Sequence, residues 1–221
     1  MIFVLVMNTF IVGNSIVREL QDSHGFTTIS IPGLTWMSAL RYLTSNIQRF
    51  SNSIVYIHIG PVRFSILSQS RSHNRCSLDR QSNNNPNDVI EPFRHRLSTN
   101  NINIVLCTIY HMDFTIYNNH ISALARVNNA NLAFDSEGET RRMRNMVVVE
   151  NRRIVDYNMA NNMATPYMHR RIFTRRNHAY RFRVQLLRDG LHPTRQIIND
   201  WAREIRRVNV INMGRLRRRF V

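Results

Sequence analysis

The sequence contains no lysine, so all 30 of its basic residues are arginine. Acidic residues number only 14, which leaves a formal net charge of +16. Guanidinium groups stay charged at physiological pH and present a planar set of donors that suits phosphate and carboxylate groups. A surface of this kind attracts nucleic acid or another anionic partner. A solvated surface that serves only solubility is the alternative, and the composition leaves both interpretations open.

Cysteine and glycine are also scarce. The two cysteines, Cys76 and Cys107, do not make the disulfide framework of a small secreted domain. The 7 glycines form neither a P-loop nor a Gly-x-Gly-x-x-Gly motif, so we expect no phosphate-cradling loop. The histidines show no metal-ligand spacing with cysteines or carboxylates. We therefore expect no metal and no cofactor.

Long hydrophobic runs are missing as well. The apolar segment 1–13 lacks a positively charged start, is interrupted by Asn8 and is too short to span a membrane. Cleavage of this segment as a signal peptide would remove the strand that precedes the motif described below. We therefore expect no transmembrane segment, and an intracellular or virion-associated protein in preference to a secreted one.

Hydrophobic residues make up 43% of the 221 residues, which is enough for a sizeable core. Short β-branched runs with near-continuous apolar character are typical of parallel strands that are covered on both faces. Four such runs predict buried strands: Phe10–Val12, Thr27–Ile31, Ile54–Ile59 and Ile102–Ile109. Helical segments lie between them, so the fold class predicted is α/β, a three-layer α/β/α sandwich with a mostly parallel sheet.

Helices are predicted where apolar residues recur at steps of three and four. Trp36–Phe50 and Thr194–Val208 show this pattern clearly, and Ser15–Leu20 begins another helix. Glu139–Asn161 is ambiguous, because a weak helical face competes with the strand-like run Val147–Val149. We favour a helix there.

The domain organisation follows from two polar stretches. Residues 68–88 are rich in Ser, Asn, Arg and Gln, and they predict a loop insertion, either a lid over a site or a simple surface insertion. Residues 210–221 form a basic C-terminal tail. Residues 1–209 are predicted to form one domain.

Two motifs carry candidate chemistry. Gly13-Asn14-Ser15 follows a strand and begins a helix, where backbone N–H groups favour developing negative charge on a nucleophilic serine. An ordinary helix N-cap is the alternative for Ser15. In Asp189-Gly190-Leu191-His192-Pro193 the carboxylate can orient the imidazole, which then acts as a base toward a distant serine. An ordinary turn is the alternative for that segment.

Together, and in this order, the two motifs resemble the first and last blocks of the SGNH (GDSL-type) serine hydrolases. The resemblance spans roughly residues 9–208 and implies a triad of Ser15, Asp189 and His192 that cleaves an acyl or acetyl ester. Ile31-Pro32-Gly33-Leu34-Thr35 resembles the second block. It implies an oxyanion hole made by the backbone N–H groups of Ser15 and Gly33. Thr165-Pro166-Tyr167-Met168-His169 is similar to a segment of SGNH-like domains in mobile elements and viruses.

The third block of that family, Gly-x-Asn-Asp, is altered. Here the sequence reads Gly60-Pro61-Val62-Arg63, and valine cannot donate the hydrogen bond that the family's asparagine gives to the oxyanion. Loss of one such donor costs about 10²–10³ in rate. Arg63 is a candidate replacement donor, or a clamp for an anionic substrate. We take Asn14, Gly60 and Arg63 as candidate substrate contacts.

The alternative function is a catalytically weakened protein of this fold. Its arginine-rich surface would bind nucleic acid, or it would serve as a structural or interaction protein of a virion. The candidate nucleic-acid contacts are the arginines of the C-terminal region: Arg203, Arg206, Arg207, Arg215, Arg217, Arg218 and Arg219.

Overall fold

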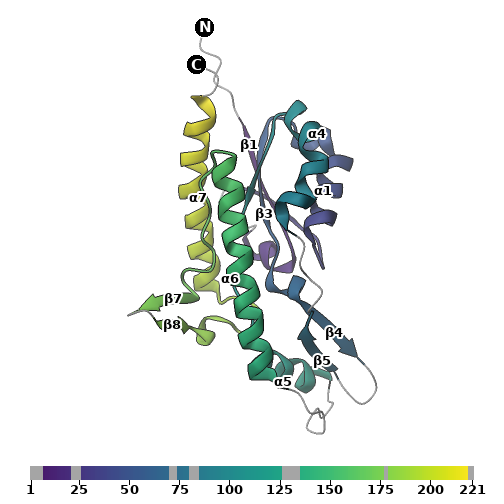
Figure 1. The fold of residues 1–221 in the computed structure, drawn as a ribbon, viewed down its shortest axis with the longest axis vertical. Coiled ribbons are helices and arrows are strands. Elements are labelled where there is room, and N and C mark those ends of the chain that lie inside the picture. Colours follow the sequence, from purple (N-terminus) through teal and green to yellow (C-terminus); the bar gives the residue numbers. More distant parts are fainter. Residues whose placement is uncertain are drawn as a thin grey trace.

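A four-stranded parallel sheet forms the centre of the structure, a computed structural model that describes residues 7–20, 26–69, 74–79, 85–125, 135–176 and 179–218 (Figure 1). The strand order is β2-β1-β3-β6, and every neighbouring pair is parallel. The strands are β1 (Asn8–Gly13), β2 (Thr27–Ser30), β3 (Ser53–His58) and β6 (Ile102–Leu106). Each of the four predicted runs overlaps one of them, so the prediction of the central strands is confirmed.

Side chains alternate along the strands between two separate hydrophobic clusters. Phe10 and Val12 of β1 belong to one cluster, whereas Ile11 between them belongs to the other. All six residues of β3 are buried. A strand covered on both faces has no polar side to alternate with, which explains the continuous apolar runs in the sequence.

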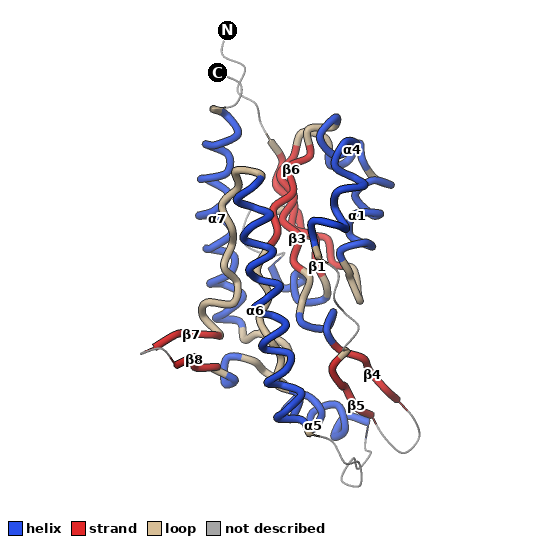
Figure 2. Tube along the Cα trace, in the orientation of Figure 1, coloured by secondary structure: helices blue, strands red, loops and turns tan. Residues whose placement is uncertain are grey.

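Helices cover both faces of the sheet, which makes the predicted three-layer α/β/α sandwich (Figures 1 and 2). The first face packs against α1 (Trp36–Ser45), α3 (Pro86–Ile90) and α4 (Arg94–Thr99). The second face packs against the 3₁₀ helix η1 (Ser15–Leu20) and the long α7 (Arg195–Arg217). The fold class inferred from the sequence is confirmed.

Helix α6 (Ser136–Ala160) runs along the free edge of β6, so the helix predicted over residues 139–161 is confirmed. Its Asn158 side chain accepts a hydrogen bond from the Leu106 N–H (2.9 Å) and donates one to the Leu106 carbonyl (2.8 Å). Asn151 binds both backbone groups of Ile109 in the same way, at 2.7 Å each. These amides satisfy strand-edge groups that another strand would otherwise pair.

The polar stretch 68–88 differs from the loop that was predicted. It contains part of an antiparallel hairpin, β4 (Ser65–Gln69) with β5 (Asn74–Leu78), and the first turn of α3. The Asn118 side chain, on α5 (Phe114–Ala125), binds both backbone groups of Cys76 at 2.6 and 2.9 Å. In β5 the buried Cys76 and Leu78 alternate with polar residues, but this pattern is only two apolar residues long, so it was too weak a strand signal among polar neighbours.

The basic tail predicted from residue 210 is also different in the structure, because α7 continues to Arg217. Asn212 and Leu216 are buried and extend the face of Val208 at steps of four residues. Asn212 accepts from the Ala164 N–H (2.6 Å) and donates to the Ala164 carbonyl (3.2 Å). The concentration of arginines obscured this stripe in the sequence.

The remaining elements are short: α2 (Ile47–Phe50), η2 (Pro61–Phe64), η3 (Glu91–Phe93), η4 (Val184–Leu186), and the hairpin strands β7 (Phe173–Arg176) and β8 (Ala179–Phe182). Within the described residues, no helix has both the length and the apolar character that crossing a membrane requires.

Candidate active site

A cavity of about 640 Å³ lies at the edge of the sheet where the parallel strands end. It brings together Ser15, which follows β1, with Asp189 and His192, which precede α7. Ligand sites of α/β sheets are generally found at this carboxyl edge. The three residues of the predicted triad therefore line one cavity, although they lie near opposite ends of the chain. The rest of the lining is Arg18, Glu19, His120, Arg188 and Arg195.

The turn that carries Ser15 is held by its neighbour, Asn14. The buried Asn14 side chain accepts a hydrogen bond from the Ile16 N–H (3.2 Å), and the backbone carbonyl of Asn14 accepts one from the Ser30 hydroxyl (3.1 Å). A side chain at Gly13 would meet the His58 carbonyl at 2.8 Å and the side chain of Val17. The chain can therefore turn sharply at this point, which leaves Ser15 exposed as the first residue of η1.

Asp189 orients His192 through several hydrogen bonds. One carboxylate oxygen, Oδ2, lies 2.7 Å from His192 Nδ1. The other, Oδ1, accepts from the N–H groups of His192 (2.7 Å) and Leu191 (3.0 Å). Because Nδ1 faces the carboxylate, Nε2 is the ring nitrogen left to act on a substrate or on a serine.

The contacts of Asp189 favour its ionised form. Burial pushes the pKa of the carboxyl upward, but the side-chain and backbone hydrogen bonds of His192 and the N–H of Leu191 outweigh burial. The net result is a pKa well below the ordinary value for aspartate. A second imidazole, His120, approaches the same oxygen with its Nε2 at 3.8 Å.

The Asp–His turn rests on a buried aromatic group. The Tyr110 hydroxyl donates to the Leu191 carbonyl (2.7 Å), and the Tyr110 ring lies 5.4 Å from that of Trp201 on α7. Gly190 adopts φ +82°, and a Cβ there would meet the Tyr117 N–H at 2.8 Å. Only glycine fits this position without strain.

An ion pair joins the two halves of the site. Glu19, on the 3₁₀ helix that begins at Ser15, binds Arg188, which directly precedes Asp189. Both side chains are partly exposed, so the pair adds little to the free energy of folding. The pair connects η1, which begins at Ser15, to the turn that carries Asp189 and His192.

The structure places Gly33 in an exposed turn between β2 and α1, with φ +65°. The segment that precedes this turn pairs with β1, because the Ile31 N–H donates to the Gly13 carbonyl at 2.8 Å. Gly33 does not line the cavity of Ser15. Its part in an oxyanion hole stays a prediction.

The third-block residues Gly60 and Arg63 contact other parts of the protein and do not face the cavity of Ser15. A Cβ at Gly60 would clash with Asn14 Nδ2, so this glycine allows the Asn14 amide to pack against the backbone. Arg63 forms an ion pair with Glu150 of α6 at 2.9 Å, and both side chains are at most 5% exposed. Neither Gly60 nor Arg63 lines the cavity. The side chain of Val62 lies outside the described part of the chain.

The buried Arg63–Glu150 pair is surrounded by further polar and aromatic groups. Trp36 Nε1 donates to Glu150 Oε1 at 2.9 Å, and Arg153 lies 3.8 Å from Oε2. Burial lowers the pKa of Arg63 and raises the pKa of Glu150, while the attraction between the two charges opposes both shifts. The pair thus ties the segment after β3 to α1 and α6, and it does not face the cavity that holds Ser15.

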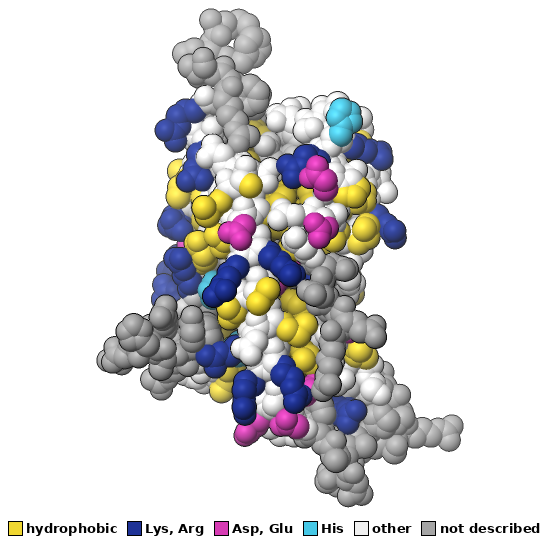
Figure 3. Space-filling model, viewed as in Figure 1, with side chains coloured by type: hydrophobic (Ala, Val, Ile, Leu, Met, Phe, Trp, Pro, Cys, Tyr) yellow, Lys and Arg dark blue, Asp and Glu magenta, His cyan; other side chains and the backbone are white. Residues whose placement is uncertain are grey.

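The predicted nucleic-acid contacts lie along α7, apart from Arg219, which is outside the described residues. Arg203 pairs with Asp200, and Arg207 pairs with Glu204. Arg206, Arg217 and Arg218 are exposed, and Arg215 Nη1 lies 3.4 Å from the Asn162 carbonyl. On the face shown in Figure 3, the basic side chains are scattered among acidic and hydrophobic ones, with no continuous basic patch.

Five lining residues of the cavity were not identified from the sequence. Arg18 and Glu19 follow Ser15 by three and four residues, whereas Arg188 and Arg195 flank the Asp–His turn, so their proximity to the motifs was an available signal. His120 lies on α5 and reaches the site only through the packing of that helix. No local pattern could have found it.

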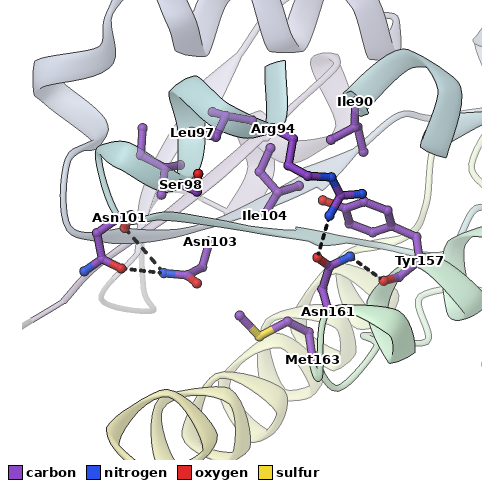
Figure 4. Close-up of a pocket in the computed structure, with 11 residues that line it drawn as sticks. Ile90, Arg94, Leu97, Ser98, Asn101, Asn103, Ile104, Tyr157, Asn161 and Met163 are labelled. Carbon is purple, nitrogen blue, oxygen red and sulfur yellow. Dashed lines mark hydrogen bonds between the residues drawn. The ribbon is translucent and has the colours of Figure 1, made fainter. Parts of the chain in front are cut away.

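A second cavity, of about 380 Å³, lies at the opposite edge of the sheet, where β6 begins (Figure 4). Arg94 Nη1 points toward Asn161 Oδ1 across it at 3.4 Å, and Asn161 in turn donates to the Tyr157 carbonyl at 2.8 Å. Among its described lining residues there is no histidine and no carboxylate to activate a nucleophile. In this respect the second cavity differs from the cavity of Ser15, which is lined by a serine, two histidines and two carboxylates.

Comparisons with known proteins were made for both sequence and structure. No model of a protein family matches the sequence, and neither does any curated protein sequence. A GDSL-like lipase from Bacteroides thetaiotaomicron is similar in structure, with a TM-score of 0.59 and 17% identity over 90% of this chain and 86% of that one. A protein from Bacteroides fragilis described as an acylhydrolase is similar with a TM-score of 0.60 and 16% identity, over 95% of this chain and 92% of that one. A lipolytic protein of the G-D-S-L family from Veillonella parvula is similar with a TM-score of 0.54 and 10% identity, over 92% of this chain and 98% of that one.

These similarities establish the SGNH (GDSL) hydrolase fold over nearly the whole chain and confirm the fold that the motif resemblance implied. The particular resemblance of residues 165–169 to domains of mobile elements and viruses stays a prediction.

Proposed function

We propose that this chain, which has the fold of the G-D-S-L lipolytic proteins, hydrolyses an ester through Ser15, His192 and Asp189. The observation that carries the proposal is the shared cavity. It is lined by an exposed serine and by a histidine whose Nδ1 lies 2.7 Å from a carboxylate. Nucleophilic catalysis requires this combination of an accessible hydroxyl, a base and a group that orients the base.

In the proposed reaction, Ser15 Oγ attacks the acyl carbon while His192 Nε2 takes the hydroxyl proton. The tetrahedral intermediate collapses, and His192 returns the proton to the departing alcohol. The acyl group stays bonded to Ser15 until a water molecule, deprotonated by His192, attacks the acyl carbon. Collapse of the second intermediate releases the acid and returns the proton to Ser15. Asp189 stabilises the imidazolium in both steps without taking a proton, as its lowered pKa requires.

Stabilisation of the oxyanion is proposed to come first from the backbone N–H of Ser15, because Gly33, the second donor that the motif resemblance implies, does not line the cavity. We propose that the third donor of the family is missing, because the motif resemblance places valine at its position, 62. Arg63 does not replace it, since its guanidinium is held by Glu150. An oxyanion hole that lacks one donor lowers turnover by about 10²–10³ relative to a complete one. The chain is therefore proposed to be a slow esterase.

Turnover of p-nitrophenyl acetate tests the proposal. The Ser15→Ala variant is expected to lose enzymatic hydrolysis down to the background rate. Ser45→Ala is the matched control, because Ser45 is an exposed serine of α1 away from the cavity, and it should keep the wild-type rate. Equal rates for wild type and Ser15→Ala would refute the proposed function.

A second candidate function, nucleic-acid binding, is favoured by the exposed arginines Arg206 and Arg217 of α7 and Arg218 at its C-cap. Each neutralised phosphate contributes a slope of roughly 0.9 to a log–log plot of duplex affinity against salt. Replacing Arg217 and Arg218 by Gln should lower this slope by about 2 in filter-binding titrations. Replacement of Arg41 and Arg96, which are exposed on the opposite layer, should not change it. An affinity that is independent of salt would exclude this function.

A further inference from the structure

The cavity around Ser15 carries an excess of positive charge. Three arginines, Arg18, Arg188 and Arg195, line it together with two carboxylates, Glu19 and Asp189. Both carboxylates are engaged within the site, since Glu19 binds Arg188 and Asp189 binds His192. Two guanidinium groups of the lining remain without an acidic partner in the cavity.

Arg18 and Arg195 are those two groups. Both are exposed, and neither forms an ion pair with any residue in the described ranges of the chain. An exposed arginine on an ordinary surface needs no explanation, because water solvates it. Two of them in the lining of one cavity, next to a nucleophile, are different, because they repel each other and every further cation that enters.

The two arginines come from opposite halves of the site. Arg18 follows Ser15 by three residues on η1, and Arg195 follows His192 by three residues as the first residue of α7. A group held between them would therefore lie next to both the nucleophile and the base. The positive end of the dipole of α7, a helix of 23 residues, adds to the same field.

The proposed chemistry does not neutralise this charge. When Ser15 attacks, its proton moves to His192 and a negative charge forms on the ester oxygen, so the net charge of the site stays the same. The charges of Arg18 and Arg195 therefore stay uncompensated throughout the reaction. A substrate that brings its own anionic group compensates them, and guanidinium binds carboxylates and phosphates through paired hydrogen bonds.

We propose that the substrate is an ester with an anionic group, a carboxylate or a phosphate, which Arg18 and Arg195 bind beside the reacting ester. The inference rests on the proposed function, since it names the class of substrate for the same site. The anionic group can belong to the acyl part or to the alcohol part of the ester, and the experiment below separates the two.

Three esters test the proposal: neutral p-nitrophenyl acetate, mono-p-nitrophenyl succinate with a carboxylate on the acyl part, and 4-acetoxybenzoate with a carboxylate on the alcohol part. Wild type should favour one anionic ester, and high salt should weaken this preference. Replacing both Arg18 and Arg195 by Gln should lower kcat/KM for that ester by about tenfold or more, as expected for loss of charge-assisted hydrogen bonds. The loss should be smaller for the neutral ester, because that ester has no anionic group for the two guanidiniums to bind.

The control variant replaces Arg41 and Arg96 by Gln, which removes the same charge away from the cavity, and it should keep the preference. An equal loss for neutral and anionic esters in the Arg18/Arg195 variant would overturn the inference, because the arginines would then act on the reacting centre. Equal rates for all three esters in wild type, each divided by the rate of uncatalysed hydrolysis of that ester, would also overturn it.

Calorimetric binding of the same esters to Ser15→Ala decides the matter without turnover. Tighter binding of an anionic ester, lost when Arg18 and Arg195 are replaced, supports the inference even if wild type hydrolyses nothing, in which case only the proposed function fails. Equal binding of neutral and anionic esters contradicts the inference whatever the turnover.

Discussion

The Asp189–His192 turn and the segment Gly60–Phe64 both lie near the carboxyl edge of the sheet, but different contacts hold them in place. In the turn, an ionised carboxylate accepts hydrogen bonds from the imidazole and from two backbone N–H groups, beside a cavity. In the other segment, Arg63 is buried against Glu150, and its charge is used within the protein.

The difference shows that a charged group that reacts and a charged group that stabilises the fold need different surroundings. A group that reacts must keep a free ring nitrogen and an open path to solvent, and His192 is half-buried with its Nε2 unengaged by Asp189. A buried ion pair gives up that freedom, and its formation costs so much desolvation that loss of either partner is destabilising. Variants at the two places should therefore affect catalysis and folding separately.

The largest effect is expected from His192→Ala. Removal of the base should lower kcat for p-nitrophenyl acetate by about 10⁴ or more, as for other triads, with little change in the thermal midpoint. His120→Ala is the matched control, because this exposed imidazole also approaches Asp189, at 3.8 Å, and it should retain most activity. A larger loss in His120→Ala than in His192→Ala would contradict the assignment of the base.

Glu150→Gln should instead destabilise the fold. Leaving Arg63 buried without its carboxylate costs about 3–5 kcal/mol, which urea denaturation would measure as a lower unfolding midpoint. Glu137→Gln, an exposed change on the same helix, should cost less than about 0.5 kcal/mol. If both variants unfolded at the same urea concentration, the Arg63–Glu150 pair would have no structural role.

Acid should lower the free energy of unfolding, and His58 should contribute to this loss. Burial lowers the pKa of His58 to about 4 from the ordinary 6.5, and both ring nitrogens are buried without a hydrogen-bond partner among the described residues. The folded state therefore favours the neutral ring, so its stabilising contribution is complete above pH 6.5. This contribution is lost as the pH falls from 6.5 toward 4.

The loss should reach about 3 kcal/mol at pH 4 for His58 alone. His111 and His169, whose pKa values burial lowers to about 3 and about 4, should add to it. His58→Phe retains a ring in contact with Tyr110 and Trp201. It should reduce the slope of unfolding free energy against pH by the amount that corresponds to uptake of about one proton. An unchanged slope in His58→Phe would show that this histidine does not carry the acid sensitivity.

The smallest effect is expected from Val62→Asn, which returns the family's amide to the third block. Loss of such a donor costs about 2.7–4 kcal/mol elsewhere, and an added amide that is imperfectly placed should recover a fraction of that, about tenfold in turnover. The gain should appear in kcat more than in KM, because the contact strengthens as the oxyanion forms. A change confined to KM would indicate that position 62 contacts the ground state of the substrate.

The sequence predicts the parts of this molecule that depend on local patterns. The four central strands and the triad candidates follow from apolar runs and from two short motifs. The asparagine contacts of Asn151 and Asn158 with the edge of β6 could not be predicted, because they join residues far apart in the sequence. The same holds for His120, which only the packing of α5 brings to the site.

Charge was the least predictable feature. Arg63 was a candidate substrate contact because it occupies a motif position, yet the carboxylate that holds it lies on α6, far along the chain. Arg18 and Arg195 carried no motif and line the cavity. The partner of an arginine depends on tertiary packing, so composition alone identifies an excess of charge and not its location.

Labelling with a fluorophosphonate, followed by mass spectrometry of the peptides, tests the central claim most directly. The account predicts a single covalent adduct on Ser15 that forms quickly in wild type, because His192 activates the hydroxyl. The adduct should be absent in Ser15→Ala and strongly reduced in His192→Ala. A folded wild-type protein that does not react, or that carries the label on another residue, would contradict the claim that Ser15, His192 and Asp189 form a catalytic triad.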